Sequence, residues 1–238
     1  MKASLEDRFQ SFLDNLPYSQ KIVPGRPNVG HGEKQADYLL HGGKIVAEIK
    51  TLKEPQSQKG ELVVNEYIDH IGVKIFGTLP LSRVARSDEH LLALDKTISR
   101  RMTRGIERIC KSADEQIGAE FNRLPHLATG VLILINENLS DLHPRAVADR
   151  IVDFTSSRAT NIHYCLLVFE SHLARINNRL LPYPLLLDLT YSARQRRSIN
   201  FLKAAQNGWA RQNGFPNGLP NPEPREIEYH PSSIIFGQ

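Results

Sequence analysis

The sequence predicts an α/β domain with a central mixed sheet flanked by helices. Three features indicate this class: an amphipathic helix at the N-terminus, two apolar segments joined by Gly42-Gly43, and later strand-like segments that alternate with helical patterns. The 238 residues allow one large domain, or one domain with a sizeable insertion. Such a chain can bury its own core, so its stability requires neither disulfides nor a structural metal.

The N-terminal part of the chain contains the clearest local signals. Ser4 is followed three residues later by Asp7, which is typical of a helix start, and Pro17 ends the helical pattern. The apolar residues between them recur at helical spacing: Leu5, Phe9, Phe12, Leu13 and Leu16. After a loop rich in Pro and Gly, residues 35–41 and 44–52 predict the two strands of a hairpin with a two-glycine turn.

The middle of the chain is less uniform. Residues 53–90 are apolar in places without a clean period, so a helix and a pair of strands both remain open there. From Ser87 to Phe121 the apolar residues step by three or four, which predicts one long helix ended by Leu124-Pro125. Further along, the patterns predict strands over 130–136, 161–170 and 185–189 and a helix over 140–154.

These segments predict a single domain over residues 1–205 with an insertion at 53–90. Residues 206–238 are dense in Asn, Gly and Pro, and we interpret them as an extended tail or surface wrap.

Composition excludes several classes of protein. No apolar run approaches the roughly 20 residues that a membrane helix needs, so we expect no membrane partner. Cys110 and Cys165 stand alone without a CxxC spacing, which excludes a cysteine-rich zinc module and favours a reducing compartment. The first ten residues carry acids instead of the apolar stretch of a signal peptide, so a cytoplasmic location is expected. The net charge of +4 is too small to identify a partner.

Three charged residues on the predicted hairpin carry the chemistry. Asp37 lies at the head of the first strand, and Glu48 and Lys50 lie two residues apart on the second. Because side chains alternate along a strand, Glu48 and Lys50 point to one face and Ile49 to the other. Pairing across the glycine turn can bring Asp37 beside that face. The sequence therefore predicts two carboxylates and one ammonium group close together.

Such a cluster requires compensation. Two carboxylates at about 4 Å repel by roughly 4 kcal/mol at an effective dielectric constant near 20. A divalent cation between them, or partial neutralisation by Lys50, relieves that repulsion. Mg²⁺ takes one or two carboxylates and completes its shell with water and phosphate oxygens, which suits hydrolysis of a phosphodiester. An ordinary solvated ion pair is the alternative, but the apolar flanks of Glu48 and Lys50 argue against it.

The order of elements and the D-x(10)-E-I-K spacing resemble the PD-(D/E)XK nuclease superfamily, whose restriction-endonuclease-like core has a helix, a three-strand meander, a helix and a strand. The resemblance covers about residues 4–155 and implies a metal-dependent nuclease that uses Mg²⁺ or Mn²⁺. It implies metal binding by Asp37, Glu48 and the backbone carbonyl of Ile49, with Lys50 as the catalytic lysine. Ala36 stands where the motif name has proline.

The resemblance also implies two supporting residues. In many relatives an acid on the first helix completes the metal site, a role that Glu6 would take here; the alternative is a first-turn acid that only favours the helix dipole. Gln116 resembles a glutamine that some relatives carry on the helix after E-x-K, and the alternative is a solvated helix face.

The long predicted helix carries a basic stripe, defined as Lys96, Arg100, Arg104, Arg108 and Lys111. Its members follow one another at intervals of three or four residues, away from the apolar seam. A stripe of this kind can contact nucleic-acid phosphates, although a solvated cationic face gives the same pattern.

We therefore predict a metal-dependent endonuclease, with DNA favoured over RNA because most relatives cut DNA, and with a homodimer as a possible form. Two alternatives remain open at this point. One is a catalytically inactive nucleic-acid-binding module of the same fold, and the other is a protein-interaction scaffold.

Overall fold

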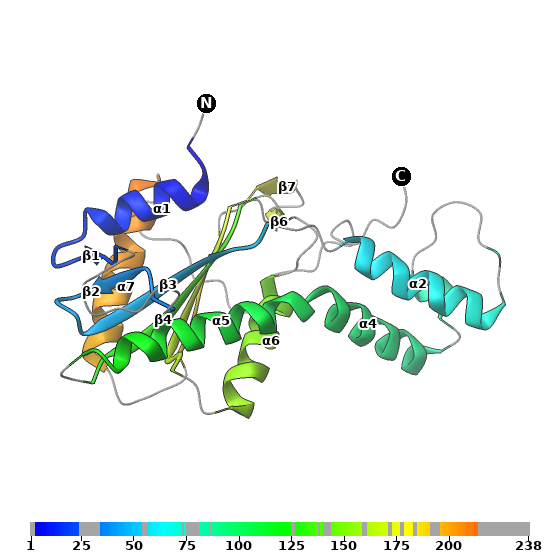
Figure 1. Cartoon of the computed structure of the whole chain (residues 1–238). Helices are drawn as coiled ribbons and strands as arrows, with labels where there is room; N and C mark the ends of the chain where they lie inside the picture. Colours follow the sequence, from blue (N-terminus) through cyan, green and yellow to red (C-terminus); the bar gives the residue numbers. More distant parts are fainter. Residues whose placement is uncertain are drawn as a thin grey trace.

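A computed structural model describes residues 3–23, 34–53, 57–72, 74, 81–85, 87–124, 127–137, 139, 144–158, 161–170, 173–176, 179–182, 185–190 and 196–213. These residues form an α/β fold with a mixed sheet between two layers of helices (Figure 1). The predicted class is thereby confirmed.

The central sheet contains six strands in the order β1-β2-β3-β4-β5-β8. Their bounds are β1 Gln20–Lys21, β2 Tyr38–Leu40, β3 Ile45–Thr51, β4 Thr129–Asn136, β5 Tyr164–Phe169 and β8 Leu185–Thr190. The three strands β1, β2 and β3 form an antiparallel meander, β3, β4 and β5 run parallel, and β8 closes the sheet antiparallel to β5. A separate two-stranded sheet pairs β6, Leu173–Ile176, with β7, Arg179–Pro182.

Seven helices surround these strands in the part of the chain that the structure describes. They are α1 Leu5–Asp14, α2 Ser57–Ile71, α3 Leu81–Val84, α4 Asp88–Met102, α5 Arg104–Phe121, α6 Pro144–Ser157 and α7 Arg196–Gln212. The helices α1 and α7 cover one face of the sheet, and α5 and α6 cover the other (Figure 1).

Alternation along the central strands produces two separate apolar cores. On β3, the side chains of Ile45, Ala47 and Ile49 join the core under α1 and α7, while Val46 joins the core under α5 and α6. Strands β4 and β5 divide their side chains in the same way, and every residue of both strands is buried. A strand that is apolar on both faces is typical of the parallel centre of an α/β sheet.

The hairpin turn differs from its predicted form. Strand β2 ends at Leu40 and β3 begins at Ile45, so the connection has four residues instead of two. His41, Gly42 and Gly43 all have positive φ angles. The two glycines supply left-handed conformations that side chains disfavour, and His41 adopts the same conformation at some steric cost.

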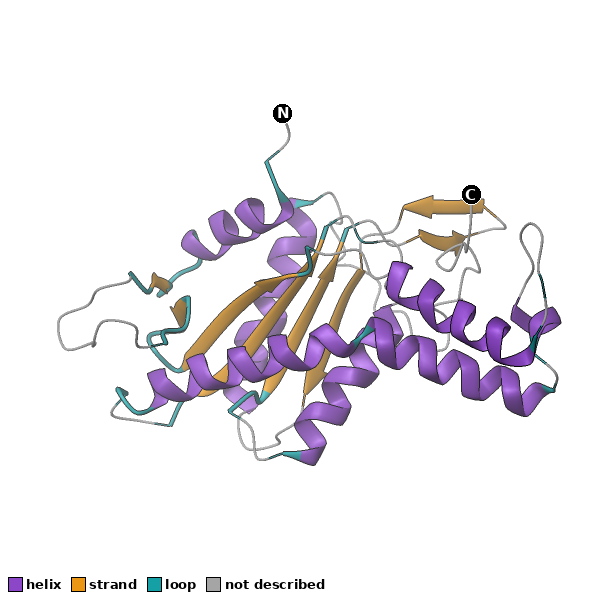
Figure 2. Cartoon of the chain, turned by 45° about the vertical axis from the view of Figure 1, so that its right-hand side comes forward, coloured by secondary structure: helices purple, strands orange, loops and turns teal. Residues whose placement is uncertain are grey.

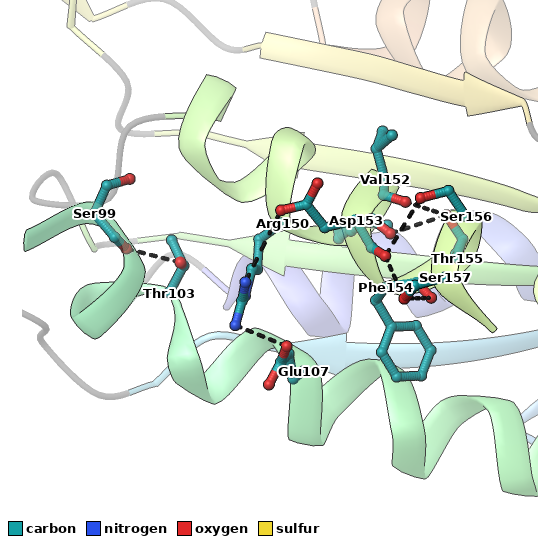
Figure 3. A network of polar contacts seen from close by, with 11 residues as sticks. Ser99, Thr103, Glu107, Arg150, Val152, Asp153, Phe154, Thr155, Ser156 and Ser157 are labelled. Atoms are coloured by element: carbon teal, nitrogen blue, oxygen red, sulfur yellow. Dashed lines mark hydrogen bonds and ion pairs between the residues drawn. The ribbon is translucent and has the colours of Figure 1, made fainter. Parts of the chain in front are cut away.

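The single long helix predicted from Ser87 to Leu124 is wrong in one respect, because it consists of two helices that meet at Thr103. Thr103 has φ −90° and ψ 1°, and its buried hydroxyl group donates a hydrogen bond of 2.7 Å to the carbonyl oxygen of Ser99 (Figure 3). The apolar period runs on through this joint, which is why the sequence pattern shows no break.

In the predicted insertion, for which the sequence allows helix or strand, the described residues form the helices α2 and α3. Helix α2 lies along α4, and both project beyond the edge of the sheet (Figure 2). Val63 and Val64 of α2 and Leu94 and Ile98 of α4 are buried in one core with the inner face of α5. We call the pair α2 and α4 the arm.

The boundary predicted at residue 206 is wrong, because α7 continues to Gln212. Trp209 of α7 is buried, and its ring meets those of Phe9 and Phe12 edge-on at centroid distances of 4.8 and 5.5 Å. This aromatic packing holds the helix on α1 past the predicted boundary. The remainder of the predicted tail, residues 214–238, lies outside the described residues.

Among the helices that the structure describes, none combines the length and the apolar character that crossing a bilayer would require.

Candidate active site

Strand β3 carries two charged residues on an otherwise apolar core strand. Glu48 and Lys50 face helix α5, while their neighbours Ala47 and Ile49 face α1 and α7. The side chain of Glu48 is only 1% exposed, and that of Lys50 is 26% exposed. The cluster is therefore buried at Glu48 and open to solvent at Lys50.

Asp37 reaches this strand from the position just before β2. The pairing of β2 with β3 ends at Tyr38 opposite Ala47, so the amide group of Ile49 lies two residues past the last pair. That N–H donates a hydrogen bond of 2.8 Å to the Asp37 carboxylate. Asp37 thus replaces the missing strand partner at the point where β2 and β3 separate.

The backbone N–H and C=O groups of Ile49 point to the side of β3 on which Asp37 lies. The amide group of Leu52 donates to Ile135 and the carbonyl group of Lys44 accepts from Thr129, so even-numbered residues of β3 bond to β4. In a strand the N–H and C=O groups of one residue point the same way, and those of the odd-numbered Ile49 therefore point toward Asp37.

Glu48 is the electrostatically strained member of the cluster. The pKa of its carboxyl group is raised to about 7, mainly by burial and further by the charge of nearby Asp37, while Lys50 opposes the shift. Its Oε1 lies 2.6 Å from the Lys50 ammonium nitrogen. Its Oε2 is buried without a hydrogen-bond partner among the described residues. An unpaired buried carboxylate oxygen is costly, so this atom is suited to binding a cation or a proton.

Lys50 is held from two sides. Besides the contact with Glu48, its ammonium group donates a hydrogen bond of 2.8 Å to the amide oxygen of Gln116 on α5. Gln116 also accepts from the hydroxyl group of Ser112 at 3.1 Å and donates through its amide nitrogen to the carbonyl oxygen of Gln35 at 2.8 Å. Gln116 is thereby fixed between α5 and the segment that leads to Asp37.

Glu6, expected as a further metal ligand, lies elsewhere. Its carboxylate accepts a hydrogen bond of 2.7 Å from the hydroxyl group of Thr51 and lies 3.8 Å from the Lys53 ammonium nitrogen. Thr51 alternates with Lys50, so it extends toward the α1 face of β3. In the described part of the chain, no group of three or more His, Cys, Asp and Glu residues could hold a metal ion. The cluster described above thus contains the carboxylates of Asp37 and Glu48, while Glu6 contacts Thr51 and Lys53.

The basic stripe lies on the outer surface of α4 and α5. All five of its side chains are exposed, whereas Ile98, Met102, Ile106 and Cys110 on the opposite side of these helices are buried. The stripe and the cluster share helix α5, because Arg108 lies four residues before Ser112 and eight before Gln116.

Sequence reasoning missed two contributors to the cluster. Ser112 supports Gln116 from one helical turn earlier, and the carbonyl group of Gln35 holds the amide of the same glutamine. The i,i+4 spacing of Ser112 and Gln116 is a signal that could have indicated the first contact. A backbone carbonyl leaves no signature in a sequence.

The chain was compared with protein-family models, curated proteins and solved structures, and none of the three comparisons gives a match. The functional argument therefore depends on the geometry of the cluster.

Proposed function

We propose that this protein is a metal-dependent nuclease of restriction-endonuclease-like fold that hydrolyses phosphodiester bonds, with DNA as the preferred substrate. The observation that carries the proposal is Glu48, a buried carboxylate that faces a second carboxylate and has one oxygen without a partner. Structural ion pairs satisfy their buried oxygens, whereas functional sites are where such unfavourable groups persist.

The order of the elements supports the same proposal. A helix, a three-strand antiparallel meander, a helix and a parallel strand follow one another as α1, β1-β2-β3, α5 and β4, with the arm inserted after β3. This is the order that the resemblance to the PD-(D/E)XK superfamily implies. Asp37 lies just before the second strand, and Glu48 and Lys50 lie on the third.

The donor set fits a hard divalent cation. Asp37, Glu48 and the carbonyl oxygen of Ile49 are all oxygen donors at one edge of β3, and Mg²⁺ commonly uses one or two carboxylates. The unpartnered Glu48 Oε2 is an available ligand atom. When bound there, Mg²⁺ or Mn²⁺ would acidify water and offset the charge that develops on the phosphate.

The chain's own groups have separate tasks in this proposal. Lys50 projects from the buried end of the cluster toward solvent, where its ammonium group can hold a phosphate oxygen or the attacking water. Gln116 is a positioning residue, because it keeps Lys50 in place by a hydrogen bond to the ammonium group. Asp37 both holds the backbone of Ile49 and contributes charge to the cluster.

The experiment is a cleavage assay on plasmid, linear duplex and single-stranded DNA and on RNA, each with Mg²⁺, Mn²⁺ or EDTA. The informative variant is Asp37→Asn, because an amide oxygen can still accept the hydrogen bond from Ile49 while the charge is removed. We expect metal-dependent cutting by the natural protein and a loss of at least about 100-fold in Asp37→Asn.

Lys203→Ala provides the matched control, since Lys203 is exposed on α7 on the opposite side of the sheet. It should cut as the natural protein does. Salt-sensitive binding of nucleic acid without cutting under any condition would contradict nuclease activity and indicate the catalytically inactive binding module. The absence of both binding and cutting would favour the protein-interaction scaffold.

A further inference from the structure

We infer that the α4 side of the arm is a phosphate-binding extension of the active site, which grips a flank of the nucleic acid several nucleotides from the bond that is cut. Lys96 and Arg100 are the residues that make this contact. The inference rests on the proposed function in assuming a nucleic-acid substrate, and it adds where the substrate lies and how long it must be.

The first step is the direction of the arm. Helix α5 lies on the sheet, and α4 continues from its N-terminal end past the edge of the sheet, with α2 beside it (Figures 1 and 2). On the α4 side of the joint, the buried hydroxyl group of Thr103 bonds to Ser99; on the α5 side, Arg150 of α6 forms an ion pair of 2.7 Å with Glu107 in the first turn of α5 (Figure 3). The joint is thus supported on both sides.

The second step concerns helix α4, which has one face that packs in the core and one face that points away from α2. Leu94, Ile98 and Met102 of α4 are buried in the core that α2 shares. Lys96 and Arg100 each lie two positions from two of these residues, about 160° around the helix axis from either, and therefore face away from α2. Both side chains are exposed. Arg101, which lies next to the seam, instead pairs with Glu66 of α2 at 3.6 Å.

The third step is the balance of charge. The four acids of α5 have partners of their own: Glu107 pairs with Arg150, Asp114 accepts from the backbone amide of Asn161, Glu115 pairs with Lys34, and Glu120 pairs with Arg123. The five cations of the basic stripe, in contrast, form no ion pair with any residue for which the structure gives a position. Lys111 interacts electrostatically with Glu115, but no ion pair within the described residues neutralises Lys96 or Arg100, and a polyanion can bind these two side chains without displacing a protein partner.

The fourth step is continuity with the active site. Lys96, Arg100, Arg104 and Arg108 repeat every four residues, and the same repeat reaches Ser112 and Gln116, which hold Lys50. At 1.5 Å per residue, the path along the axes of α4 and α5 from Lys96 to Lys111 is about 22 Å, and the break at Thr103 makes the direct span no longer than this. Duplex DNA advances about 3.4 Å per nucleotide of one strand, so the stripe matches a flank of at most about six base pairs.

The experiment measures binding of fluorescent duplex DNA by anisotropy, in EDTA and across about 50 to 200 mM salt. The variant is the double substitution Lys96→Ala and Arg100→Ala. The control is Lys203→Ala with Arg211→Ala, which removes two exposed cations from α7 on the other side of the sheet. Circular dichroism and thermal unfolding establish that both proteins are folded, as expected for exposed positions changed to a strong helix former.

The plot of log K against log salt has a negative slope, and we expect this slope to be shallower by about two in the arm variant than in the natural protein. Each of the two phosphate contacts that are removed contributes about 0.9 to the slope. Over a fourfold range of salt, the natural protein and the control should therefore lose about tenfold more affinity than the arm variant. In the cleavage assay the arm variant should have a higher KM on long duplexes. Its turnover on a duplex too short to reach the arm should match that of the control.

An arm variant with the same affinity and the same salt slope as the control would overturn the inference, even if the protein cuts DNA. Conversely, a reduced slope in a protein that never cuts would leave the arm as a binding surface and refute the nuclease. The failures of the two proposals are thus distinguishable.

Discussion

The two faces of strand β3 are formed by alternate residues of one seven-residue segment, and they differ in polarity and in their effect on stability. On one face Ile45, Ala47 and Ile49 pack under α1 and α7 and bury only carbon. On the other face Glu48 and Lys50 replace core residues and form polar contacts with α5. The apolar face stabilises the fold by removing area from water. The charged face costs stability, because Glu48 is buried with a raised pKa and an unpartnered oxygen.

The position of a residue on β3 thus determines whether its side chain stabilises the apolar core or joins the charged cluster. A cost that is confined to alternate residues, beside a face that shows no such cost, is what the proposed function would explain. Substitutions on the two faces should therefore differ in effect, and those on the charged face should have the larger effect on activity.

The largest effect is expected on the charged face, from Lys50→Met. Methionine retains much of the apolar volume of the lysine stem and removes the ammonium group, so the fold should persist while the contact with phosphate or water is lost. Cleavage at saturating DNA should fall by at least about 100-fold in single-turnover measurements. Unaltered turnover in this variant would remove Lys50 from the chemistry.

Glu48→Gln is expected to make the folded protein more stable at pH 8. The pKa of Glu48 is raised from 4.5 to about 7 in the folded protein, so the folded state binds more protons than the unfolded state between these values. The free energy of unfolding therefore falls as pH rises from about 4.5 to 7, by roughly 3 kcal/mol for a shift of this size.

Glutamine carries no charge and removes this penalty. At pH 8 in EDTA the variant should unfold about 5–10 °C above the natural protein, and near pH 4.5 the two should differ little. Thermal unfolding followed by circular dichroism checks both points. Equal melting temperatures at pH 8 would mean that Glu48 is not strained in the folded state, and a variant that still cuts DNA would mean that its charge is not used.

A smaller effect is expected for Gln116→Ala. Lys50 keeps its contact with Glu48 but loses the hydrogen bond that fixes its orientation. Residues that orient a catalytic group typically contribute about 10- to 100-fold, and we expect kcat to fall by about tenfold with KM unchanged. A rise in KM at constant kcat would instead assign Gln116 to substrate binding.

The smallest effect is expected on the apolar face, from Ile45→Val. Ile45 is fully buried, and removing one methylene group typically costs 0.5–1.5 kcal/mol, or about 1 kcal/mol here. Chemical denaturation should show this loss, and the cleavage rate should equal that of the natural protein. A loss of activity comparable to that of Gln116→Ala would show that the two faces are not independent.

Much of the fold was predictable because its elements are locally specified. Ser4 does cap the first helix, and its hydroxyl group accepts from the amide of Asp7 at 3.0 Å. The apolar runs at β4 and β5 identified buried strands, since parallel strands are apolar on both faces. The proximity of Asp37, Glu48 and Lys50 followed from the period of two along a strand and from the glycine turn.

The features that the sequence did not predict depend on distant partners. Helix α2 contains adjacent buried valines, Val63 and Val64, which obscure the helical period in the sequence. Their burial depends on the packing of α2 against α4. The break at Thr103 reflects a change of partner along the helix, from α2 to the sheet, which leaves the apolar spacing intact. The extension of α7 past residue 206 depends on Trp209 meeting two aromatic rings of α1.

The candidate site was predictable in its residue types and not in its burial. The sequence could not indicate that Glu48 would be almost fully enclosed and Lys50 partly open, because that difference arises from α5 lying across β3. The same arrangement separates Glu6 from the cluster, since α1 covers the opposite face of the strand.

Calorimetric titration with Mn²⁺ at pH 6 and pH 8, in buffers of different ionisation enthalpy, tests the central claim most directly. Glu48 has a pKa of about 7, so its carboxyl group is mostly protonated at pH 6 and must release that proton to bind a cation. We predict one site that releases close to one proton at pH 6 and close to none at pH 8, and that is lost in Asp37→Asn. The absence of Mn²⁺ binding, or binding that Asp37→Asn leaves unchanged, would contradict the account.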